Sequence, residues 1–150
     1  MVRLWTTLAV TLCTAALLTV GAAVSAAQEG KDTPLARLMR KVEDQTKVIR
    51  DGVKTAPRFR KAAKEIATSA HALAQLGQET RPFTEPAQEF KKPQEYWNQL
   101  TDGFIEASQA MAKAADASDF ITARKVWISL NNTCTNCHGA FRPSTEDEPF

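Results

Sequence analysis

The chain has 150 residues, of which 43% are hydrophobic, and its 19 basic and 17 acidic side chains leave a formal net charge of +2. This near-neutral balance gives no reason to expect nucleic acid or a membrane surface as a partner. The length suits a single domain with a hydrophobic core, once an N-terminal leader is set aside.

That leader is residues 1–27, which have the pattern of a Sec-type signal peptide. Arg3 provides a positive start, the apolar run "LAVTLCTAALLTV" follows, and "VSAAQ" offers small residues for cleavage after Ala26 or Ala27. The apolar run is short for a membrane span. We therefore expect a periplasmic protein whose mature chain does not insert into a membrane. Its two remaining cysteines, Cys134 and Cys137, are too few for a disulfide framework.

The first two predicted helices follow the leader. Thr33 can cap the first helix and Pro34 suits its first turn, and apolar residues then recur every three or four positions until Gly52. A second helix with the same periodicity is expected from Pro57 to about Gly77. Neither segment shows the alternation of a strand.

The connector after the second helix, "GQETRPFTEPAQEFKKP", contains three prolines and exceeds ordinary loop lengths. It is long enough to contain a short helical turn or to shape a site. A third amphipathic helix is predicted over 93–117, and a fourth begins near Ser118 and Asp119 after a short break. Residues 28–143 are therefore expected to form an all-α, antiparallel four-helix bundle, followed by an acidic flexible tail over 144–150.

The fourth helix carries a Cys-x-x-Cys-His run within "NNTCTNCHGAFRP". On a helix, Cys134, Cys137 and His138 lie at positions i, i+3 and i+4 and share one face, directed toward the bundle interior. Two thiols at this spacing can be alkylated by the two vinyl groups of a haem, and the adjacent imidazole can coordinate its iron. We expect one covalent haem c per chain.

Two other kinds of site contain a similar Cys-x-x-Cys motif. A structural zinc ion takes four ligands, but His71 is the one other histidine in the sequence and no third mature cysteine exists. A thioredoxin-type dithiol follows a strand in a βαβ unit, which this pattern lacks. Only twelve residues follow His138, and none is Met, His or Lys, so a second protein ligand to iron would come from an upstream helix.

At this point the chain resembles the class II c-type cytochromes, the cytochrome c-prime family. The resemblance covers the mature chain and is carried by "AADASDFITARKVW" through "CTNCHGAFR", by "KKPQEYW" and by "RLMRKV". It implies that Cys134 and Cys137 form the haem thioethers, that His138 is the proximal ligand, and that Arg142 packs near it. As large apolar residues, Trp97 and Trp127 are expected in the core beside the porphyrin, and Trp127 lies seven residues before Cys134 on the same face of its helix. The resemblance also implies a homodimer.

One position in the first helix separates two functions within this family. A bulky apolar residue there leaves the iron five-coordinate and open to gases, whereas a Met supplies a sixth ligand and makes a low-spin electron carrier. Met39, in "RLMRKV", matches this position, although Met is also a common core residue. Met111 fits the core stripe of the third helix. Leu35 stands where the family commonly has an Arg, which leaves contact with the haem propionates to Arg37 or Arg40.

We therefore expect a one-electron carrier with His138 and Met39 on the iron, which exchanges electrons with redox partner proteins. The alternative is a five-coordinate protein that binds nitric oxide or carbon monoxide. Peroxidase-like activity is not expected, because His71 reads as a boundary residue and no catalytic constellation stands out, so the chain is not read as an enzyme. The basic stretch over 50–64 could steer an acidic partner, but a solvated face is the simpler interpretation.

Overall fold

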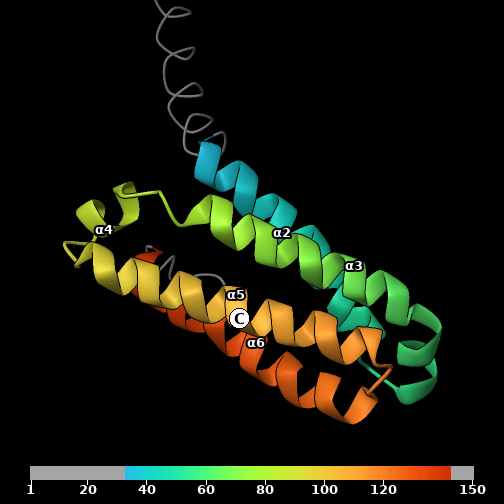
Figure 1. The fold of residues 1–150 in the computed structure, drawn as a ribbon. Coiled ribbons are helices and arrows are strands. Elements are labelled where there is room, and N and C mark those ends of the chain that lie inside the picture. Colours follow the sequence, from blue (N-terminus) through green and yellow to red (C-terminus); the bar gives the residue numbers. More distant parts are fainter. Residues whose placement is uncertain (1–32, 143–150) are drawn as a thin grey trace, which may run out of the picture. The chain divides into compact units, whose positions relative to one another are not determined.

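A computed structural model describes residues 33–142 of the chain (Figure 1). The expected signal peptide and the expected acidic tail lie outside these residues. The elements are α2 (Pro34–Gly52), α3 (Ala56–Thr80), the short α4 (Glu85–Glu89), α5 (Gln94–Asp116) and α6 (Phe120–Phe141). Over 33–142 there is no strand, and the four long helices pack antiparallel, which confirms the predicted all-α four-helix bundle. No helix within this range is both long and apolar enough to cross a membrane.

The helices begin where capping chemistry predicts. Thr33 accepts the N–H of Ala36 at 3.1 Å in the first turn of α2. Thr55 has an extended backbone before α3, and its hydroxyl accepts the N–H of Arg58 at 3.5 Å. The Asp119 carboxylate accepts the N–H of Thr122 at 3.0 Å before α6. Each oxygen thus satisfies an N–H group that has no partner within its own helix.

The compact unit of the fold runs from Leu38 onward, and its core is densest near the α2–α3 and α5–α6 turns. All four long helices contribute to a set of fully buried apolar side chains there, and the predicted core position of Met111 is confirmed because that residue has no exposed surface. The set is Ile49, Val53, Phe59, Ile66, Leu73, Met111, Ala123 and Leu130.

α3 and α5 approach each other closely at Gly77. A Cβ atom there would lie 2.6 Å from Ile105 Cγ1 and 3.1 Å from Phe104 Cδ1, closer than carbon atoms can pack without movement. The second helix was predicted to end near Gly77, but this glycine lies within the last turn of α3. The glycine permits close helix packing, and α3 continues to Thr80.

The connector between α3 and α5 is folded against the bundle and contains α4, as its length allowed. Pro86 and Ala87 of α4 are buried. The N–H of Lys92 donates to Ala87 O at 2.9 Å, and the Gln94 side chain donates to Phe83 O at 3.1 Å. These bonds hold the connector at the end of the bundle where α6 finishes.

Candidate haem-attachment site

The Cys-x-x-Cys-His run occupies the last two turns of α6, as expected. Cys134, Cys137 and His138 are all half-buried, and both cysteines are free thiols. The Cys134 Sγ–H group donates to Leu130 O at 3.5 Å, one turn earlier in the helix. Because the run is regular α-helix, the two thiols and the imidazole lie on one side of α6.

An aromatic cluster that sequence reasoning missed fixes the end of this helix. The Phe141 ring lies 5.2 Å from the ring centre of Trp97, 5.7 Å from that of Tyr96 and 6.4 Å from that of Phe90. Trp97 is buried, and its indole N–H donates to Thr80 O at 3.4 Å. The last turn of α6 is thereby joined to the connector and to the start of α5, three residues after His138.

Burial sets the protonation of the three candidate residues. It raises the pKa of the Cys134 thiol, and burial followed by the nearby charge of Cys134 raises the pKa of Cys137 to about 11. Both groups are therefore neutral thiols near pH 7, unlike the low-pKa cysteine of a redox dithiol. Burial and then the Arg142 charge lower the pKa of His138, so its imidazole is neutral and a ring nitrogen can coordinate iron.

Arg142 follows His138 by one helical turn. It ends α6, and its backbone N–H donates to His138 O at 3.0 Å. Trp127 is half-buried and packs against the core. Cys134 follows it by seven residues, two helical turns later, and so lies on the same side of α6. Met39 is half-buried on α2, in contrast to the fully buried Met111.

The residues at this end of the bundle fit a large apolar group. Protein atoms cover Ile49 on the apolar stripe of α2 and Ala123 and Leu130 on that of α6 completely, whereas Val126 and Trp127 between the latter two are half-buried. Toward the opposite end the same stripes are only partly covered by protein. The partly covered side chains are Leu38, Met39 and Val42 on α2 and Cys134, Cys137 and His138 on α6. A porphyrin joined to the two thiols would contact such apolar side chains and would take the neutral imidazole as an iron ligand.

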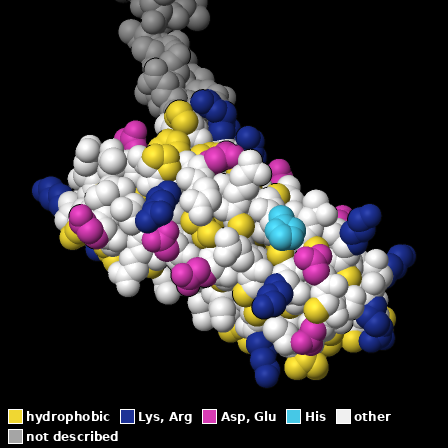
Figure 2. Space-filling model, viewed as in Figure 1, with side chains coloured by type: hydrophobic (Ala, Val, Ile, Leu, Met, Phe, Trp, Pro, Cys, Tyr) yellow, Lys and Arg dark blue, Asp and Glu magenta, His cyan; other side chains and the backbone are white. Residues whose placement is uncertain are grey.

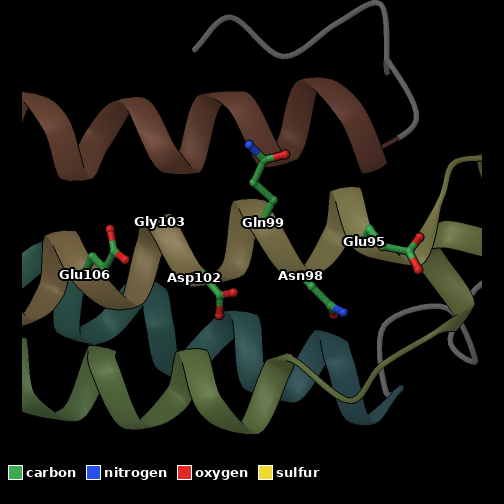
Figure 3. A pocket seen from close by; sticks show the side chains of 6 residues that line it. All are labelled: Glu95, Asn98, Gln99, Asp102, Gly103 and Glu106. Carbon is green, nitrogen blue, oxygen red and sulfur yellow. The ribbon is translucent and has the colours of Figure 1, made fainter.

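Other candidate chemistry lies elsewhere. Within 33–142 no three His, Cys, Asp or Glu side chains converge to hold a metal ion directly. His71 is exposed rather than at a boundary, and its Nε2 lies 3.6 Å from Asp116 Oδ2 on the bundle surface, so it is not placed as a distal acid–base group. An open hollow on the outside of α5 is lined by polar side chains of that helix alone (Figure 3).

Comparison with known protein families then decides the class of protein. A family model described as Cytochrome C' matches residues 34–142, which include every helix from α2 to α6. The chain belongs to the cytochrome c′ family. Cytochromes c′ carry covalent haem c in a four-helix bundle, are not enzymes and are typically periplasmic; the family is itself a standard example of this bundle topology. No curated protein and no solved structure matches the chain.

Proposed function

We propose that this cytochrome c′ is a one-electron carrier of the periplasm, with one haem c joined to Cys134 and Cys137 and its iron held by His138 and Met39. The proposal rests on the register of α2 against α6, that is, on the levels of Met39 and His138 along the bundle axis.

The register is fixed near the turns by a hydrogen bond from Arg124 Nη1 on α6 to Val53 O, just after α2, at 3.3 Å. His138 follows Arg124 by 14 residues, and Met39 precedes Val53 by the same 14 residues. Because the helices are antiparallel and each rises about 1.5 Å per residue, both side chains lie roughly 21 Å along the bundle from this bond. Met39 is therefore at the level of His138, on the opposite helix.

The chain's residues would hold the haem and tune it. When bound, the haem supplies an iron that exchanges one electron between its ferrous and ferric forms. Cys134 and Cys137 would hold the haem through one thioether bond each. His138 would hold the iron through its neutral imidazole, and the Met39 thioether, also neutral, would favour the ferrous form. The half-buried apolar side chains exclude water and disfavour the extra positive charge of the ferric form.

The aromatic packing beside His138 supports electron exchange rather than chemistry on a substrate. The Phe141 cluster holds the turn of α6 that follows His138, and no catalytic acid–base group accompanies the site in the described range. A carrier whose ligands keep their positions in both oxidation states needs little reorganisation for each transfer. We propose other redox proteins as its partners, and export by the signal-like residues 1–27 as its route to the periplasm.

The experiment exchanges Met39 and uses Met111 as the matched control. Met39→Leu and Met111→Leu make the same change of side chain, and Met-to-Leu exchange in a core usually costs less than about 1.5 kcal/mol. Met39→Leu should abolish the thioether-to-iron band of the oxidised visible spectrum and open the reduced iron to carbon monoxide. Met111→Leu should keep the wild-type spectra. A Met39→Leu protein with unchanged spectra would exclude Met39 as a ligand and would favour the gas-binding alternative.

A further inference from the structure

A group of exposed basic side chains lies at one end of the bundle. Figure 2 shows lysine and arginine side chains gathered at the end where the α2–α3 and α5–α6 turns lie in Figure 1. We call this group the basic end. Its members are all exposed and come from α2, α3 and α6 and the turn between the first two: Arg50, Lys54, Arg58, Arg60, Lys61, Lys64, Arg124 and Lys125.

Few of these charges are neutralised by the protein. Asp51 pairs with Lys54 at 2.7 Å, and Asp119 is occupied in capping α6. Within 33–142, six members of the basic end form no ion pair: Arg50, Arg58, Arg60, Lys61, Lys64 and Lys125. The eight basic side chains outnumber the carboxylates of Asp51, Glu65 and Asp119 among them, so this end is positively charged although the whole chain is nearly neutral.

This end is remote from the candidate haem site. Cys134 follows Arg124 by ten residues and His138 follows it by 14, which places them roughly 15 and 21 Å farther along α6. Electron transfer slows steeply with distance, so a redox partner would dock near the Cys-x-x-Cys-His run. The basic end fits a partner that holds the protein without exchanging electrons with it.

Exposed aliphatic side chains adjoin the basic end. Ile121 is 64% exposed and Ile128 is 61% exposed, seven residues apart on one face of α6, with Lys125 between them. Basic side chains combined with exposed aliphatic ones bind anionic bilayer surfaces, through attraction to lipid headgroups and shallow apolar contact. We propose that the basic end holds this protein reversibly on the surface of an anionic phospholipid bilayer, with the Cys-x-x-Cys-His end facing away.

The test is co-sedimentation of the purified holoprotein with vesicles. The anionic vesicles contain about one third phosphatidylglycerol in phosphatidylcholine, the neutral vesicles contain phosphatidylcholine alone, and the salt is about 0.1 M, where the Debye length is about 10 Å. We expect binding to the anionic vesicles, release in about 1 M salt, and no binding to the neutral ones.

Two double variants with the same change of net charge locate the surface. Arg58→Glu with Lys61→Glu should weaken binding about tenfold or more, whereas Lys91→Glu with Lys92→Glu, in the connector at the opposite end, should change it less than about twofold. Equal weakening by both variants, or no binding to anionic vesicles, overturns the proposal. Binding to polyglutamate with the same variant dependence, but not to vesicles, overturns it in favour of an acidic protein. The visible spectrum reports the proposed electron-carrier function independently of all these results.

Discussion

Replacing Gly77 by alanine should destabilise the bundle, although alanine is the better helix former. In a helix interior, glycine to alanine gains roughly 0.5 to 1 kcal/mol. At Gly77 the new methyl group would lie 2.6 Å from Ile105 Cγ1 and 3.1 Å from the Phe104 ring. Neither atom is the free end of a flexible chain, so α3 and α5 must separate. Overpacking of this kind costs about 1–3 kcal/mol, which after the helix-propensity gain leaves a net loss of up to roughly 2.5 kcal/mol.

Gly103 provides the matched control, because it is also within a long helix but a Cβ atom there meets nothing within 4 Å. Gly103→Ala should gain up to about 1 kcal/mol, and because this gain is common to both sites, the two variants should differ by the overpacking cost of roughly 1–3 kcal/mol. Urea unfolding of each holoprotein, followed by far-ultraviolet circular dichroism, measures the difference. Equal stabilisation by both substitutions would refute the close packing of α3 on α5.

Three further predictions concern packing, polar satisfaction and pH. Leu130→Ala should cost about 3 kcal/mol in urea unfolding because Leu130 is fully buried, whereas Ile128→Ala, at a 61% exposed site, should change stability by less than about 0.5 kcal/mol. Thr46→Val should raise stability by about 1 kcal/mol, since the buried Thr46 Oγ1 has no hydrogen-bond partner in the described range; a loss would reveal one. Hydrogen bonds from the Thr122 hydroxyl and N–H lower the pKa of Asp119 below its ordinary 3.8, so this stabilisation is complete above pH 3.8 and is lost as the pH falls through the lowered value. Asp119→Asn should therefore show a weaker acid loss of stability than the wild type, and parallel acid unfolding curves would contradict this.

The sequence predicted those features that depend on local chemistry. Helix starts at Pro34 and after Asp119 follow from capping residues, and the shared face of Cys134 and His138 follows from helical spacing. The end of α3 was placed too early because glycine commonly follows the last residue of a helix. Only the contact of Gly77 with α5 shows that this glycine permits close helix packing.

Features that depend on tertiary placement were beyond the sequence. Phe141 and Trp97 each stood on an apolar stripe, but no spacing shows that their rings meet at the end of α6. The basic stretch over 50–64 was visible, yet its distance from the Cys-x-x-Cys-His run depends on which ends of the helices coincide. The positions of Met39 and His138 along the bundle can likewise be compared only once the contact between Arg124 and Val53 is known.

The electron-carrier proposal is tested most directly by adding carbon monoxide to the reduced wild-type holoprotein while its visible spectrum is recorded. If Met39 occupies the sixth position on the iron, the sharp low-spin spectrum should remain unchanged by the gas. A broad high-spin spectrum that shifts when carbon monoxide is added would show an open position on the iron, and would identify the protein as a gas-binding cytochrome c′ instead.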